Sequence, residues 1–330
     1  MENNNPQKIK LLILYRKLLT CTDEMHPLTT EELCGFLAEN NITCDRKTLS
    51  KDIDMLNSFG YEVMSKYVGH SKGYYIDDRR FSVPELKILI DAVQAADFIP
   101  EVKSECLISR IADLGGVHTA ERLKKSLSRF NVKKHTNEYI FYNIDRLSDA
   151  ISSEKRVSFY YFDLDEHARK VYRRNKQLYN TEPLSLVFCA DNYYVICYDP
   201  DTDGNFKIFR IDKMENVEIL EKNISAEAKI ELLGDEIGKY PEQAFKMFYG
   251  RLERVRLEFD DSLIGVMFDK FGEDILMFRT PENVLYSDVE LRVSPVFFGW
   301  ICQFGGKLRI TSPASVKEEF ENHMSWIKGN

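Results

Sequence analysis

The stretch CDRKTLSKDI, residues 44–53, has the pattern of an amphipathic helix that begins after its second residue. Asp45 is favoured as the N-cap, because its carboxylate can accept hydrogen bonds from the free backbone N–H groups of the first turn. At about 100° per residue, Leu49, Ile53 and Leu56 fall on one face of a helix that runs to about Phe59. The opposite face carries mainly polar and basic side chains: Lys47, Ser50, Lys51 and Asp54. A single helix of this kind is more often an ordinary solvated surface, so its neighbours decide its meaning.

The neighbouring segments give this helix a context. Residues 7–20 and 28–41 have helical apolar spacing, and Thr29 with Glu32 forms a capping-box pattern at the start of the second segment. After the helix, EVMSKYVGHSKGYYI (62–76) predicts two strands around a glycine-containing turn. Three helices followed by a hairpin is the layout of a winged helix-turn-helix, which we assign to residues 1–80.

In that fold the start of the third helix enters the major groove, and the hairpin touches the DNA backbone. The predicted DNA contacts therefore lie on two elements: Arg46, Lys47, Thr48, Ser50 and Lys51 on the helix, and Lys66, His70, Lys72 and Tyr74 on the hairpin. Asp52 lies close to the buried side of the helix and is expected to pair internally. Asp54 faces outward and is expected to limit non-specific binding.

The composition limits these interpretations. The net charge of the chain is -8, so any nucleic-acid binding must come from a local surface and not from bulk charge. Seven scattered cysteines without a C-x-x-C pair, and dispersed histidines, predict neither a disulfide framework nor a metal site. We expect no cofactor. The scattered cysteines are typical of buried thiols in a reducing cytoplasm, so we expect a cytoplasmic protein. No apolar run approaches the roughly 20 residues of a membrane helix, so we expect no membrane partner.

The rest of the chain divides into further segments. Residues 81–135 have helical patterns, with a Ser82–Glu85 capping box and a stop at Gly115–Gly116, and predict a helical connector that ends in the polar stretch KKHTN (133–137). Residues 136–222 begin with one helix and continue as short aromatic-rich and β-branched strands, which predict a small β-barrel or strongly bent sheet. A second linker is expected near 221–240, and residues 240–330 alternate strands and helices as a compact α+β domain.

Motifs of common enzymes are missing from the sequence. It contains no nucleophile elbow, no phosphate-binding loop and no dinucleotide-binding glycine pattern. The stretch DPDTDG (199–204) begins like a calcium loop, but the twelfth position is Arg210 where a bidentate glutamate is needed. We therefore predict no catalytic residues and a protein that is not an enzyme.

Two motifs resemble known families of bacterial regulators. TLSKDIDML (48–56) resembles the T-x-x-[RK]-D-[IL]-x-x-L signature of DeoR-like winged helix-turn-helix proteins. DNYYVICYDPDTDGNFKIFRIDKM (191–214) is similar to the centre of the WYL domain, with Tyr193, Tyr194 and Val195 at the Trp-Tyr-Leu positions and FRIDKM (209–214) at the second motif. Lys213 stands where that motif has Arg, so it lacks the two-pronged donor. GWICQFGGKLRITSPASVKEEF (299–320) looks like the extension that follows WYL domains.

The resemblance implies an α+β multidomain protein with four parts: a winged helix-turn-helix, a helical connector, a small Sm/SH3-like β-barrel and a C-terminal α+β domain. It also implies that the barrel senses a ligand. Basic and aromatic residues interleave there, as needed to stack bases and hold phosphates, although half of the aromatic residues could instead fill the core. The predicted ligand contacts are Tyr160, Arg173, Arg174, Tyr193, Tyr194, Arg210 and Lys213. Arg210 is the first choice, because it follows Phe209 on a strand and so faces away from the core if Phe209 is buried.

Together these features predict a ligand-responsive transcriptional regulator that binds double-stranded DNA as a homodimer on a two-part operator. Its effector would be a nucleotide, a single-stranded nucleic acid or another anionic ligand. Two alternatives stay open at this point: a nucleic-acid-processing enzyme, and an adaptor that no longer binds DNA.

Overall fold

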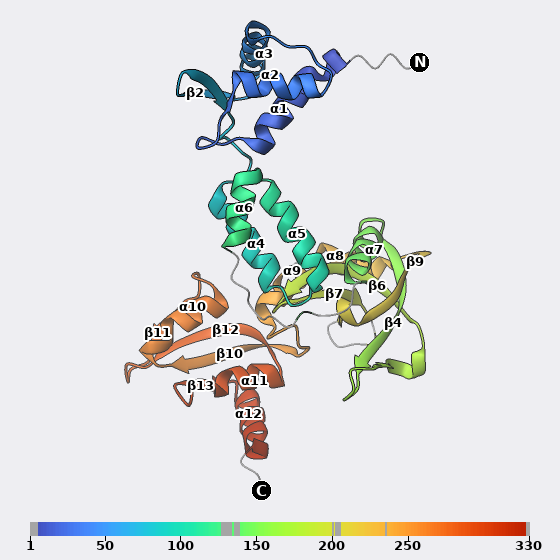
Figure 1. The fold of residues 1–330 in the computed structure, drawn as a ribbon. Helices are drawn as coiled ribbons and strands as arrows, with labels where there is room; N and C mark the ends of the chain where they lie inside the picture. Colours follow the sequence, from blue (N-terminus) through green and yellow to red (C-terminus); the bar gives the residue numbers. More distant parts are fainter. Residues whose placement is uncertain are drawn as a thin grey trace. The chain divides into compact units, whose positions relative to one another are not determined.

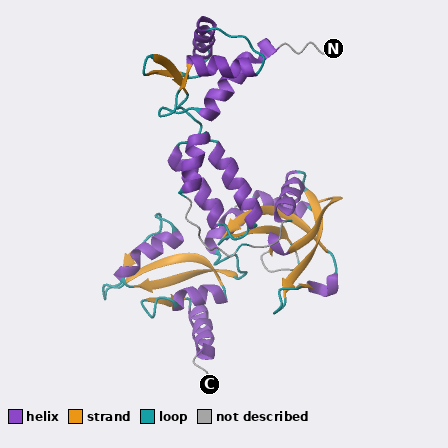
Figure 2. Cartoon of the chain, in the orientation of Figure 1, coloured by secondary structure: helices purple, strands orange, loops and turns teal. Residues whose placement is uncertain are grey.

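The computed structural model describes residues 6–126, 134, 139–199, 201, 206–234 and 236–327. The chain forms two compact units, Met1–Thr136 and Asn137–Asn330, which we describe separately. Figure 1 gives the order of the elements along the chain, and Figure 2 shows that both units contain helices and strands. No helix in these described ranges has the length and apolar character needed to cross a membrane.

The N-terminal unit begins with helices packed against a small antiparallel sheet. Its elements are η1 (Pro6–Ile9), α1 (Lys10–Cys21), β1 (Leu28–Thr29), α2 (Thr30–Glu39), α3 (Arg46–Ser58), β2 (Met64–Val68) and β3 (Ser71–Tyr75). The strand order is β1-β3-β2, so β3 is central. A core that includes the fully buried Leu14, Leu33 and Leu49 joins the three helices.

Local sequence signals fix where these helices begin. The Asp45 carboxylate accepts a hydrogen bond from the Thr48 N–H at 2.7 Å, which confirms the predicted N-cap of α3. Thr29 and Glu32 form the predicted capping box of α2. Asp52 forms an ion pair with Lys10 on α1 at 2.7 Å, and both side chains are almost buried. This confirms the prediction that Asp52 pairs inside the protein.

Three helices complete this unit: α4 (Val83–Ala95), α5 (Glu101–Asp113) and α6 (Val117–Lys125), which lie side by side in Figure 1. The Ser82–Glu85 capping box begins α4 as predicted. Gly116, with φ of 79°, separates α5 from α6, a left-handed conformation that glycine adopts at little cost. Most of the predicted KKHTN linker lies outside the described residues. Lys134 is described, and its ammonium donates hydrogen bonds to the carbonyls at the end of α4.

The C-terminal unit begins with a helix and a curled antiparallel sheet. Its elements are α7 (Ile140–Ser152), β4 (Lys155–Leu164), β5 (Lys170–Tyr172), η2 (Arg173–Lys176), β6 (Tyr179–Cys189), β7 (Asn192–Tyr198), β8 (Phe206–Arg210), η4 (Ile211–Lys213) and β9 (Met214–Asn223). The order is β5-β4-β6-β7-β8, and β9 pairs with β4. Because β4 pairs with three strands through two register shifts, the sheet bends strongly, as Figure 2 shows.

Aromatic side chains fill the inside of this curled sheet. Phe159 is fully buried, and its ring stacks on Tyr179 at a centroid distance of 5.5 Å. Phe209 and Tyr161 contact the same group edge to face. These side chains come from three strands that are distant in sequence, and together they hold the curl in place.

The prediction of a linker near residues 221–240 is wrong. Instead, β9 extends to Asn223 and is followed by α8 (Ala226–Leu233) and α9 (Glu236–Gln243). Apolar side chains from both helices, among them Ala228 and the fully buried Tyr240, pack against β6 and β7. The stretch was misjudged because its many charged residues face solvent, while widely spaced apolar residues make the contacts.

The remaining elements form a four-stranded antiparallel sheet with helices. They are β10 (Arg251–Phe259), η5 (Asp261–Leu263), α10 (Ile264–Phe271), β11 (Phe278–Arg279), β12 (Leu285–Val293), α11 (Pro295–Cys302), β13 (Leu308–Ser312) and α12 (Ala314–Ile327). The order is β11-β12-β10-β13. A core including Leu257, Met267 and Phe297 joins sheet and helices, which agrees with the predicted alternation of strands and helices.

Candidate nucleic-acid interface and anion-binding site

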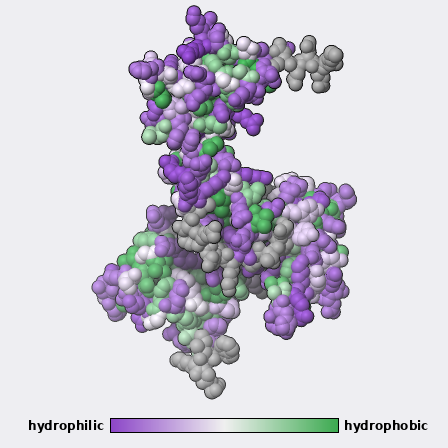
Figure 3. Space-filling model, in the orientation of Figure 1, coloured by the Kyte–Doolittle hydropathy of each residue, from purple (hydrophilic) through white to green (hydrophobic). Residues whose placement is uncertain are grey.

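The start of α3 presents cationic side chains to solvent. Lys47 and Lys51 are exposed and form no ion pair within the described part of the chain. Arg46 is 76% exposed and lies 3.7 Å from Glu31, a distance that marks a loose surface pair. The free N–H groups at the helix start add a partial positive charge. In Figure 3 the surface over α3 is hydrophilic, so this face is suited to phosphates.

Thr48 and Ser50 lie on the same helix but are half-buried, which limits them to contacts at the edge of this face. Asp54 is exposed, as expected. Its carboxylate and that of Glu31 reduce the positive charge of the surface, so any DNA affinity from this helix depends on a small number of lysine and arginine contacts.

The β2–β3 hairpin contributes fewer side chains than predicted. His70 lies at its exposed tip, next to Gly69 with φ of 59°. The Lys72 ammonium lies 5.1 Å from the Tyr74 ring, and the half-buried Lys66 lies 5.9 Å from the ring of Tyr75. The side chains of His70, Lys66 and Lys72 all remain accessible at the hairpin surface.

Tyr74 does not fit its predicted role. It is only 3% exposed, because β3 is the central strand and its side chain packs into the helical core. The aromatic residue that the hairpin does expose is Tyr67, at 78%. Sequence analysis missed it, because strand alternation alone does not say which face of a hairpin packs on the helices.

In the C-terminal unit, a short basic segment has an unusual backbone. Three consecutive residues of η2, Arg174, Asn175 and Lys176, have φ of 51°, 53° and 63°. Each non-glycine residue in this left-handed region costs roughly 1 kcal/mol. Strain of this kind persists only where surrounding contacts fix it, and it gathers at functional sites.

The contacts that fix this segment are cation–ring pairs. The Arg174 guanidinium lies 4.4 Å from the centre of the Tyr179 ring, and that of Arg173 lies 5.2 Å from the ring of Tyr161. The Lys176 ammonium lies 4.8 Å from the ring of Tyr172. These contacts hold three cationic side chains against aromatic rings of β4, β5 and β6, at the rim of the curled sheet.

Only part of this positive charge is neutralised within the protein. The Asp163 carboxylate accepts hydrogen bonds from Arg173 at 2.6 Å and from Lys213 at 2.7 Å. These two bonds, first that from Arg173, hold the pKa of Asp163 below its usual range. Arg174 and Lys176 are exposed, and neither forms an ion pair within the described residues, although Lys176 interacts electrostatically with Glu215, whose ion-pair partner is Lys170. They are therefore available to an external anion.

The Arg210 side chain is already paired within the protein. Phe209 is buried and Arg210 points to the other face, but its guanidinium forms two hydrogen bonds to Asp212, at 3.0 and 2.8 Å. The Arg210 backbone N–H also donates to the Tyr161 hydroxyl at 3.2 Å. Burial raises the pKa of Tyr161 to about 12, so this hydroxyl keeps its proton. Asp212 thus fixes the orientation of the Arg210 guanidinium, and the Arg210 side chain is 29% exposed.

The predicted ligand contacts do not all gather in one place. Tyr161 contacts Arg173 through its ring and the Arg210 backbone through its hydroxyl. Arg174 lies on the ring of Tyr179, and Lys213 shares Asp163 with Arg173. Tyr160 lies near Lys176 and Tyr172 on the rim.

The two tyrosines of the WYL-like motif take other positions. Tyr193 packs against Phe188 on the β6–β7 hairpin, with ring centroids 5.2 Å apart. Tyr194 is 8% exposed and belongs to the core shared with α8 and α9, so it does not fit a role as a ligand contact. Sequence analysis missed Lys176 and Tyr172, although the basic run RRNK was a visible signal.

Comparison with known families identifies this part of the chain. A model of the WYL domain matches residues 142–219, so the chain contains a WYL domain that spans α7 and the curled sheet. No curated protein matches the sequence.

Two solved structures are similar to the chain. One is proteasome accessory factor B/C (PafBC) of Arthrobacter aurescens, with 19% identity, a TM-score of 0.30, and coverage of 98% of this chain and 50% of that chain. The other is a CRISPR Cas-related protein, with 11% identity, a TM-score of 0.36, and coverage of 98% and 84%. The chain spans half the length of the PafBC chain.

Proposed function

We propose that this protein is a ligand-responsive transcriptional regulator that binds duplex DNA through α3 and the β2–β3 hairpin. The observation that carries the proposal is the start of α3, where Lys47 and Lys51 are exposed at a capped helix end. In this proposal residues 1–80 are a winged helix-turn-helix and residues 81–135 are a connector. Residues 136–222 are the sensing barrel and residues 240–330 are the C-terminal domain.

The DNA contacts of the proposal are Arg46, Lys47 and Lys51 for the groove, with Thr48 and Ser50 at the edge. Lys66, His70 and Lys72 would contact the backbone. A homodimer in the cytoplasm would then read two half-sites of an operator. Tyr74 is left out because it is buried.

The ligand of the WYL domain would be an anion with a flat or phosphate-bearing group. Support comes from Arg174 and Lys176, which are exposed and form no ion pair in the described part of the chain, and from the ordered guanidinium groups of Arg173 and Arg210. Arginine can both stack on a base and hold a phosphate. Nucleotides and short single strands fit this chemistry.

Binding to the duplex upstream of the protein's own gene, against a scrambled duplex, tests the DNA contacts. We expect Lys47→Ala/Lys51→Ala to weaken binding and to reduce the salt slope by roughly 2, since each phosphate contact contributes about 0.9. A control variant, Lys103→Ala/Lys125→Ala, removes two exposed lysines of α5 and α6 and should bind like the wild type.

Equal binding by the Lys47/Lys51 variant would refute the proposed interface. Failure of the wild type to bind either duplex would favour the adaptor. Cleavage of either duplex that depends on a divalent metal would favour the nucleic-acid-processing enzyme.

A further inference from the structure

The N-terminal unit contains an apolar groove between α1 and the end of α3, away from the proposed DNA contacts at the start of α3. The groove has a volume of about 320 Å³. Most of its lining is apolar or aromatic and comes from these two helices: Leu11, Leu12, Tyr15, Met55, Leu56 and Phe59. Because α1 and α3 already share a buried core, the groove is a second apolar surface on the outside of the same helix pair.

The way in which α3 ends explains why this surface is exposed. Gly60 has a φ of 84°, the left-handed conformation that commonly stops a helix. The Tyr61 N–H then donates back to the Leu56 carbonyl at 3.0 Å, and the Tyr61 ring contacts that of Tyr15 on α1 with centroids 4.8 Å apart. The Phe59 ring projects from this turn and is 77% exposed.

Phe59 is part of a larger exposed apolar patch. The side chain of Leu12 on α1 is 68% exposed, and those of Ile9, Met55 and Tyr61 are about half exposed. We call these five residues the α1–α3 patch. Together they present roughly 500 Å² of surface to solvent, a size at which an exposed apolar patch marks an interaction site.

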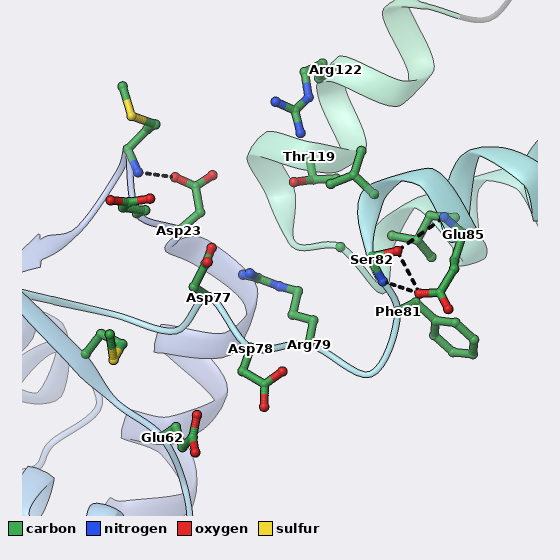
Figure 4. A pocket seen from close by; sticks show the side chains of 16 residues that line it. Asp23, Glu62, Asp77, Asp78, Arg79, Phe81, Ser82, Glu85, Thr119 and Arg122 are labelled. Atoms are coloured by element: carbon green, nitrogen blue, oxygen red, sulfur yellow. Dashed lines mark hydrogen bonds between the residues drawn. The ribbon is translucent and has the colours of Figure 1, made fainter.

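Little charge interrupts this surface. Among the described residues that line the groove, Lys8 alone is charged, and its aliphatic stem can lie on an apolar surface while its ammonium stays in water. Glu62, the residue after Tyr61, lines a different cleft with Asp77 and Asp78, as Figure 4 shows. The groove therefore suits the apolar centre of a protein interface better than a nucleic acid or a charged small molecule.

We propose that the α1–α3 patch is the contact between two copies of this chain. A two-fold dimer needs a surface that is complementary to itself, and this patch combines a groove with the projecting side chains of Phe59 and Leu12. A standard interface buries about 800 Å² on each partner, of which about 450 Å² is apolar. The exposed area of the patch meets that requirement.

The place of the patch on α3 agrees with a dimer that reads two half-sites; this step rests on the proposed function. Phe59 lies about 18 Å along the helix from Lys47, at 1.5 Å per residue. Two α3 helices that meet in line at Phe59 would place their basic starts on the outside, about 36 Å apart. Half-sites one helical turn apart on DNA are separated by about 34–36 Å.

Sedimentation equilibrium of the full chain without DNA tests the contact. We expect a concentration-dependent dimer, and dimerisation weaker by at least about a hundredfold in Leu12→Ser/Phe59→Ser, since two large apolar side chains of each copy leave the interface. The matched control is Ile88→Ser/Val102→Ser, which removes side chains that are 68% and 69% exposed on α4 and α5. It should dimerise like the wild type, and urea unfolding checks that both variants are folded.

The variant Lys47→Ala/Lys51→Ala separates this proposal from the proposed DNA interface. It leaves the α1–α3 patch intact, so it should dimerise like the wild type whether or not it binds DNA.

Three results would overturn the proposal. Equal dimerisation by the wild type and the Leu12/Phe59 variant would assign the dimer to another surface. A wild type that stays monomeric at roughly 100 µM would show that no second copy covers the patch. An equal loss of dimer in the Ile88/Val102 control would show that the effect is not specific to the patch.

Discussion

Replacing Asp163 by Asn should strengthen anion binding by the WYL domain while it weakens the fold. The Asp163 carboxylate is the shared partner of Arg173 and Lys213 and is 37% exposed. The amide is nearly the same size but carries no charge, so both cations become available to a ligand. The gain in anion affinity and the loss of stability both come from removing the Asp163 contacts with Arg173 and Lys213.

The size of the stability loss follows from the partial exposure of the two Asp163 ion pairs. Partly exposed ion pairs are each worth about 0.2–1 kcal/mol, so losing two should lower the free energy of unfolding by about 1 kcal/mol. For a short oligothymidylate, each added phosphate contact steepens the salt slope by about 0.7. We therefore expect a slope steeper by about 0.7–1.4, and binding tighter by roughly three- to tenfold at low salt. The difference in affinity between the variant and the wild type should shrink as the salt concentration rises, because these charges are exposed.

The assay is fluorescence anisotropy with a labelled oligothymidylate at several salt concentrations, beside urea unfolding of the same proteins. Asp191→Asn is the matched control: it makes the same charge change at the exposed β6–β7 turn, where Asp191 has no ion pair within the described residues. Unchanged or weaker binding with an unchanged salt slope would refute the reasoning. Equal tightening by the control would show that only net charge matters.

The pH dependence of this variant follows from the lowered pKa of Asp163. A carboxyl group whose pKa is lower in the folded state stabilises the protein above its unfolded pKa, which is about 3.9. That stability is lost as pH falls through the folded pKa. The gap in unfolding free energy between wild type and Asp163→Asn should therefore be constant from pH 5 to 7, and should close at lower pH.

Three further predictions concern stability and are measured by urea unfolding. Asp45→Ala should lower the unfolding free energy by about 1 kcal/mol through loss of the α3 cap, and an unchanged midpoint would show that the cap bond is unimportant. Gly250→Ala should lower the unfolding free energy by more than about 2 kcal/mol, because the added Cβ would lie 2.0 Å from the Val293 carbonyl oxygen. The control is Gly265→Ala on α10, where nothing lies within 4 Å of the added Cβ, and it should be neutral or stabilising. Phe159→Ala should cost about 3–5 kcal/mol, since its ring is fully buried, and a cost below 1 kcal/mol would contradict the aromatic core.

Much of the secondary structure could be read from local patterns. The caps at Asp45, Thr29 and Ser82 depend on residues three positions apart, so the sequence shows them directly. The region 221–240 was misread, because its apolar residues such as Ile224 and Tyr240 are sparse and gain their meaning only from the sheet that they cover.

The candidate site was predicted less completely, for a related reason. Residue type identified the basic and aromatic groups of the WYL domain but not their partners. Tyr74 and Tyr194 look like surface contacts in the sequence and are buried in the structure. Tyr67 and Lys176 were overlooked and are exposed.

The sequence by itself determined the order of the elements, the helix starts and the two motifs that resemble regulators, because these depend on neighbours within a few residues. Tertiary structure alone decided which charges are free. Asp163 neutralises Arg173 and Lys213, which lie 10 and 50 residues away, whereas Arg174 forms no ion pair within the described residues. Electrostatic pairing depends on distance in space, and only the folded chain sets that distance.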